Sequence, residues 1–111
     1  MKKVREEAPA VYRVEREKPL SKAQFRRLNC CRLFVDPYYQ PPNASEIQML
    51  FDIAGWNQNE AADVLGVSGG MKGSASIRRW KTDPDSPSFR AIPYATWRLA
   101  LLEAGVVKPS Q

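Results

Sequence analysis

The sequence predicts an all-α fold, in which a compact helical bundle follows an N-terminal arm and a short helix. Two observations support this fold class. Apolar residues recur at three- and four-residue spacing in several segments, as they do along one face of an α-helix. These segments are bounded by residues that cap or break helices. The 111 residues are 43% hydrophobic, which suits one globular domain with a modest core and appendages.

The N-terminal segment, residues 1–42, carries the surplus of positive charge. It contains ten Lys or Arg and five Asp or Glu, whereas residues 43–111 contain seven of each. Residues 1–18 are expected to form an extended arm or a short strand. Ser21 followed by Gln24 has the spacing of a capping box, so a helix should start there and continue to Cys31 or Arg32. Its basic side either touches phosphates or is a solvated face.

Prolines divide the chain after this helix. Pro37, Pro41 and Pro42 lie within six residues and cannot continue a helix. We therefore expect a boundary between an N-terminal appendage, residues 1–42, and the domain proper, residues 43–111.

Cys30 and Cys31 are adjacent, and the chain has neither histidine nor a third cysteine. This arrangement suits neither an ordinary structural disulfide nor a zinc site. We expect both thiols to be reduced, as small residues of the core or of an interface. A redox sensor is the alternative.

The domain proper should contain four helices. Caps, glycine stops and apolar spacing place them from Asn43 or Ser45 to Ala54, from Asn57 to Leu65, from Ser74 to Trp80 and from Ala95 to Ala104. No internal repeat is visible in the residues.

The helix that begins at Ser74 is the candidate functional element. Ile77 and Trp80 lie three residues apart and should face inward, which leaves the other side chains outward. Between Gly70 and Lys81 there are four basic residues and no acidic one. A solvated helix face would usually mix both signs, so the pattern favours a polyanionic partner.

This segment resembles a known family. The Q-x-x-x-A-x-x-L-G-V-S … I-x-x-W signature of the Cro and phage-repressor (XRE-type) helix-turn-helix proteins is matched by Gln58, Ala62, Leu65, Gly66, Val67, Ser68, Ile77 and Trp80. The resemblance covers roughly residues 45–105 and implies a lambda-repressor-like bundle whose second motif helix lies in the DNA major groove. The turn departs from the pattern, because eight residues separate Ser68 from Ile77 where the family has about three.

The resemblance implies a DNA-binding transcription regulator, a repressor, that acts on double-stranded operator DNA. Base contacts are expected from Ser74, Ala75, Ser76, Arg78 and Arg79, and phosphate contacts from Gln58, Lys72 and Lys81. A two-fold homodimer is expected, since one short helix reads only a few base pairs. The last helix is apolar over more than half of its circumference, which places the expected seam at Leu99, Leu102 and Val106. The alternative seam is the N-terminal helix, with Phe25 and Leu28.

An enzyme is not expected, because the chain shows no catalytic constellation, and neither a metal nor a cofactor is expected. The serious alternative is a protein-interaction module of the same fold, such as an antitoxin or a plasmid partition adaptor. No apolar run approaches a membrane span, and the first residues lack an apolar stretch of signal-peptide length. A cytoplasmic location is therefore expected.

Overall fold

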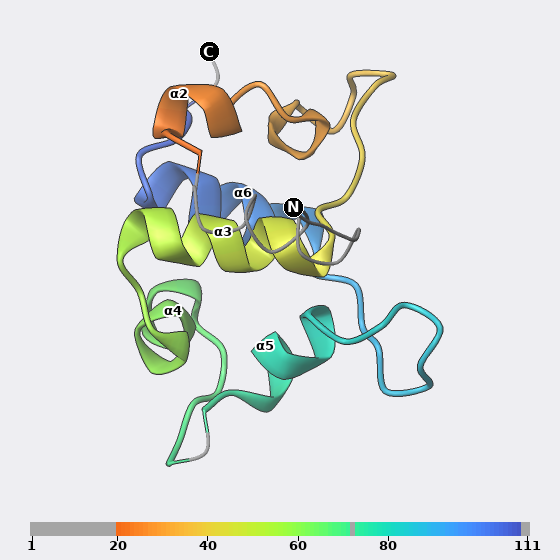
Figure 1. Cartoon of the computed structure of the whole chain (residues 1–111), viewed down its shortest axis with the longest axis vertical. Helices are drawn as coiled ribbons and strands as arrows, with labels where there is room; N and C mark the ends of the chain where they lie inside the picture. The colour runs from red at the N-terminus through yellow and green to blue at the C-terminus, as the bar shows by residue number, and fades with distance from the viewer. Residues whose placement is uncertain (1–19, 72, 110–111) are drawn as a thin grey trace, which may run out of the picture.

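The computed structural model describes residues 20–71 and 73–109, in which all regular secondary structure is helical. The elements are α2 (Lys22–Phe25), η2 (Asn29–Cys31, a 3₁₀-helix), α3 (Ala44–Ala54), α4 (Gln58–Leu65), α5 (Ala75–Trp80) and α6 (Tyr94–Glu103). The predicted all-α class is confirmed for these residues; the expected arm, residues 1–18, and Lys72 lie outside them. In Figure 1, α3 and α6 lie at the centre, with α2 above and α4 and α5 below. None of the described helices is long and apolar enough to cross a membrane.

The helix starts are fixed by the side chains that the sequence pattern indicated. At α4, Asn57 Oδ1 accepts from the Glu60 backbone N–H, and Glu60 Oε1 accepts from the Asn57 N–H, each at 2.8 Å. The same reciprocal pair closes α3 through Asn43 with Glu46 and α2 through Ser21 with Gln24. Each pair satisfies two backbone amides that have no partner within the helix. The four helices predicted for the domain proper are confirmed.

The N-terminal helix is shorter than predicted. α2 ends at Phe25, and Leu28 is extended, with φ −70° and ψ 151°, before η2 begins. Arg26 Nε donates to the Val106 carbonyl oxygen at 2.5 Å. A contact with the chain beyond α6 thus takes the place of a further helical turn, and the prediction of one helix to Cys31 or Arg32 is wrong.

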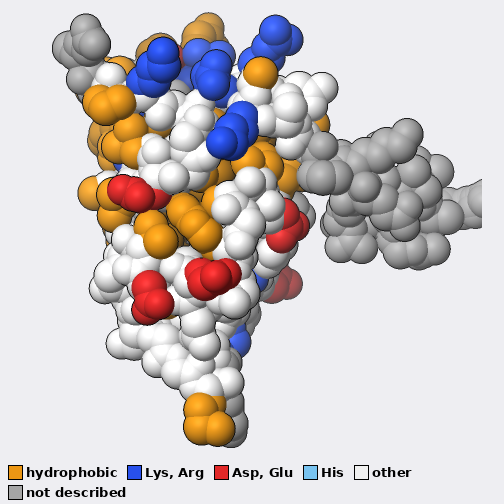
Figure 2. Space-filling view, turned by 90° about the vertical axis from the view of Figure 1, so that its left-hand side faces the viewer, with side chains coloured by type: hydrophobic (Ala, Val, Ile, Leu, Met, Phe, Trp, Pro, Cys, Tyr) orange, Lys and Arg blue, Asp and Glu red, His pale blue; other side chains and the backbone are white. Residues whose placement is uncertain are grey.

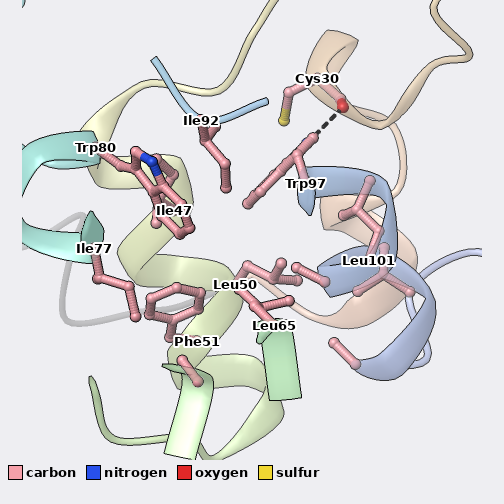
Figure 3. Packing of buried hydrophobic residues seen from close by; sticks show 14 of the residues in the cluster. Cys30, Ile47, Leu50, Phe51, Leu65, Ile77, Trp80, Ile92, Trp97 and Leu101 are labelled. Carbon is pink, nitrogen blue, oxygen red and sulfur yellow. Dashed lines mark hydrogen bonds between the residues drawn. The ribbon is translucent and has the colours of Figure 1, made fainter. Parts of the chain in front are cut away.

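The described part of the N-terminal segment shares the core with α6. Phe25, Cys30 and Cys31 are buried in the same cluster as Trp97. Trp97 Nε1 donates to the Cys30 carbonyl at 2.8 Å (Figure 3), and Arg98 Nη1 donates to the Cys31 carbonyl at 3.0 Å. Both thiols are free, as predicted. The hydrogen bond with Cys31, together with burial, raises the pKa of the Cys30 thiol.

The structure contains an internal repeat that the residues do not reveal. Residues 29–56 and 79–106 follow the same order of turn, loop and helix, with each position of the first matched fifty residues later. Gln40 N donates to the Asn29 carbonyl at 3.4 Å, and Arg90 N donates to the Arg79 carbonyl at 3.2 Å, so equivalent hydrogen bonds close both loops. Two further equivalent pairs are Asp36 N to Leu33 O with Ser86 N to Asp83 O, and Tyr39 N to Asp36 O with Phe89 N to Ser86 O. The expectation of no internal repeat is wrong.

The two halves exchange packing contacts. Cys30 of the first half meets Trp97 on the long helix of the second, and at the equivalent positions Trp80 lies beside Ile47 on α3 (Figure 3). Residues 32–42 and 82–92 form equivalent loops on one side of the molecule, one above and one below the central helices (Figure 1). Each half therefore provides a structural control for the other, since the backbone is shared and the side chains differ.

Candidate nucleic-acid interface

The loop between α4 and α5, residues 66–74, is tied to the first turn of α4 by two amide side chains. Asn59 Nδ2 donates to the Gly70 carbonyl at 2.8 Å, and the Gly70 N–H donates back to Asn59 Oδ1 at 3.2 Å. Gln58 Oε1 accepts from the Ser74 N–H at 2.5 Å. The start of α5 is thus positioned directly by α4, although the loop is long.

Gly73 makes the second of these contacts possible. Its φ is +87°, a region that L-residues rarely adopt. A Cβ at this position would overlap Gln58 Oε1 and lie 2.9 Å from Gln58 Cδ. Only glycine therefore allows the loop backbone to approach Gln58 this closely.

One face of α5 is anchored in the core and the other is exposed. Ile77 is fully buried and Trp80 nearly so, and both point toward α3 (Figure 3). Ala75, Arg78 and Arg79 are exposed, and Ser76 is half-buried. These four expected base-contacting residues therefore reach the surface.

Ser74, the fifth expected base-contacting residue, is fully buried. Its Oγ accepts from the Ile77 N–H at 3.3 Å, so the hydroxyl caps α5 and is not presented to a ligand. The cap was predicted from the sequence, whereas the burial of Ser74 follows from the contact of its backbone with Gln58.

Two of the expected phosphate-contacting residues are engaged within the chain. Gln58 holds the Ser74 N–H, as described above. Lys81 Nζ donates to Gln48 Oε1 at 2.6 Å and lies 5.9 Å from the centre of the Phe51 ring. Desolvation by the surrounding chain lowers the pKa of Lys81. The loop-binding amides of Gln58 and Asn59 were missed, although two adjacent amides opposite a glycine-rich loop are the available signal.

The residues expected at a two-fold seam are only partly accessible. Leu99 is 37% exposed and Leu102 is half-buried, but Val106 is fully buried within the single chain. At the alternative seam, Phe25 is fully buried too. A second copy therefore cannot reach Val106 or Phe25 in this fold.

The charges of the described residues are unevenly distributed. Figure 2 shows basic side chains gathered at the end of the molecule formed by α2 and acidic ones lower on the same face. Lys22, Arg26 and Arg27 are exposed on and after α2, whereas α4 exposes Glu60 and Asp63. Of the two helices joined by the loop, α5 is thus the basic one and α4 the acidic one.

Comparisons of the chain with protein-family models, with curated proteins and with solved structures find no match. A function is therefore inferred from the geometry of α4, the loop and α5, together with the sequence motif they carry.

Proposed function

We propose that the chain is a sequence-specific DNA-binding transcription regulator, a repressor, that reads operator DNA through the exposed face of α5. The observation that carries this proposal is the pair Arg78 and Arg79, exposed on a helix whose other face is fixed in the core by Ile77 and Trp80. An arginine fork matches the O6 and N7 acceptors of guanine in the major groove. Ala75 and Ser76 complete the proposed reading surface.

The internal repeat supports this assignment. Leu28 and Asn29 stand at the positions equivalent to Arg78 and Arg79, and the same turn and loop follow them. Because the shared backbone forms without arginine at either position, folding does not require these two charges. We therefore attribute them to binding.

We also propose that α3 to α6 form a lambda-repressor-like bundle with α4 and α5 as its helix-turn-helix. Ala62 and Leu65 of the signature are buried, and Gly66 ends α4 in the left-handed conformation, with φ 72°. The turn is longer than in the family, but Gln58 and Asn59 tie it down. α5 is thus held firmly enough to keep one orientation in a groove.

A second function, a protein-interaction module such as an antitoxin or a plasmid partition adaptor, is favoured by one observation. Leu33, Phe34, Val35 and Tyr38 form a run of exposed large apolar side chains remote in sequence from α5. Exposed apolar groups of this kind commonly mark protein contacts.

Salt titration of DNA binding separates the two functions. Fluorescence anisotropy of labelled random-sequence duplexes is measured at increasing salt. The regulator predicts binding at low salt and a steep linear loss, with a logarithmic slope of about −0.9 for each phosphate neutralised. Absence of binding to any duplex at low salt would reject the regulator and favour the interaction module.

A further inference from the structure

The loop of the first half presents an apolar surface, which we name the loop patch: Leu33, Phe34, Val35 and Tyr38. These side chains are 41%, 65%, 84% and 69% exposed, respectively. Among the described residues the other exposed large apolar side chains are Met71 and Leu99, each isolated in sequence. Water therefore contacts four apolar side chains within six consecutive residues, which is unfavourable unless a partner covers them.

The second half shows that the loop does not need these residues in order to fold. Asp83, Pro84, Asp85 and Ser88 stand at the equivalent positions. In the first loop the Tyr38 N–H donates to Asp36 Oδ1 at 2.8 Å, and in the second the Ser88 N–H donates to Ser86 Oγ at 3.2 Å. Polar side chains thus support the same turn, so the apolar character of the loop patch is not explained by folding.

The most bulky member of the loop patch is held in place before any partner arrives. The Phe34 ring centre lies 5.8 Å from that of Tyr39 and 5.2 Å from that of Tyr94, and the two tyrosine rings meet edge to face at 5.4 Å. The position equivalent to Tyr94 is Ala44, so this aromatic trio belongs to the first half alone. A fixed, exposed aromatic ring loses little conformational entropy on binding and suits an interface anchor.

We propose that the loop patch binds a second copy of this chain across a two-fold axis. Charge complementarity supports this occupant. Arg32 and Asp36, of opposite sign, flank the loop patch, with Arg32 Nη1 3.1 Å from Asp36 Oδ2. In a two-fold contact the same surface meets itself, so each arginine can pair with the opposite aspartate and each aspartate with the opposite arginine. Neither seam expected from the sequence remains fully available, because Val106 and Phe25 are buried.

The size of the loop patch indicates a weak dimer. An aromatic side chain buries about 150–250 Å², so at their exposures Phe34 and Tyr38 each offer roughly 100–170 Å². With Val35 and Leu33 the total is on the order of 450 Å² for each copy, or about 900 Å² for the pair. This lies below the ~1,200–2,000 Å² of stable interfaces. We therefore expect a dissociation constant in the micromolar range.

The internal repeat supplies the test substitutions. Val35→Asp with Tyr38→Ser installs the residues that the second loop carries at the same positions, so the turn should be preserved. Sedimentation equilibrium without DNA, from low to high micromolar concentration, should show the wild-type mass rise toward two chains. The double variant should associate at least tenfold more weakly, whereas Met71→Ser, which removes an exposed apolar side chain elsewhere, should match the wild type.

A second measurement needs no variant and holds if the double variant fails to fold. Amide hydrogen exchange of the wild type should slow over residues 33–39 as the protein concentration rises, and should stay unchanged over α5. A wild type that remains one chain throughout, or slowing confined to other segments, would overturn the proposal. Because both measurements omit DNA, their outcome is independent of the proposed regulatory function.

Discussion

Replacing Gly73 with alanine tests how the chain positions α5. The positive φ of Gly73 costs an L-residue about 1–2 kcal/mol. The added Cβ would also displace the Gln58 side chain, which then loses its hydrogen bond to the Ser74 N–H. Leaving that amide without its partner costs about 1–3 kcal/mol. We expect Gly73→Ala to lower the free energy of unfolding by about 2–5 kcal/mol.

Two matched variants separate the contributions. Gly66 has nearly the same φ, 72°, and nothing lies within 4 Å of a Cβ built there, so Gly66→Ala should cost only about 1–2 kcal/mol. Gln58→Ala removes the hydrogen bond alone and should cost about 1–3 kcal/mol. Because one bond is lost only once, Gln58→Ala with Gly73→Ala should be about as stable as Gly73→Ala alone. The expected coupling energy is about 1–3 kcal/mol.

Urea unfolding followed by tryptophan fluorescence measures these differences, and thermal unfolding checks them at about 4–8 °C for each kcal/mol in a domain of this size. Strictly additive losses in the double variant would refute the contact between Gln58 and the loop. So would a Gly73→Ala variant no less stable than Gly66→Ala.

Three further predictions concern the thiols, the acid limb of stability and the N-terminal arm. The thiols of Cys30 and Cys31 are buried and should react with a thiol reagent only as fast as the native protein opens; rapid modification at neutral pH would contradict this packing. The Tyr38 N–H holds the pKa of Asp36 below its ordinary 3.8, so this carboxylate stabilises the fold above that pH and the stabilisation is lost as pH falls through the lower folded-state pKa. Asp36→Asn should therefore flatten the stability profile on the acid side alone, and equal flattening near neutrality would argue against the hydrogen bond. Deleting residues 1–18 should weaken DNA binding and reduce its salt dependence, whereas an unchanged salt slope would show that the arm does not contact DNA.

The parts of the fold that local signals determine could be predicted from the sequence. Asn57 and Glu60 form the predicted capping box, and Gly66 and Gly105 adopt the left-handed conformation at the predicted ends. Caps and glycine stops act over three or four residues, so their spacing alone identifies them. The inward face of α5, with Ile77 and Trp80, followed from helical periodicity for the same reason.

The parts that depend on distant contacts could not be predicted. α2 ends early where Arg26 meets the Val106 carbonyl, eighty positions away. The internal repeat is carried by backbone hydrogen bonds and by burial, since residues as different as Cys30 and Trp80 occupy equivalent buried positions. The role of Gln58 depends on a loop that the family motif lacks, so the resemblance pointed to a phosphate where the structure has the Ser74 N–H.

The central claim, base reading by α5, is tested most directly by comparing arginine variants on two kinds of DNA. A duplex is first selected from random sequences by the wild type. Arg78→Ala and Arg79→Ala should each lose about 1–3 kcal/mol of binding free energy on the selected duplex and much less on random duplexes. Lys108→Ala removes the same charge at an exposed position beyond α6 and should affect both duplexes alike. Equal losses on selected and random duplexes for both arginines would contradict base reading by this helix.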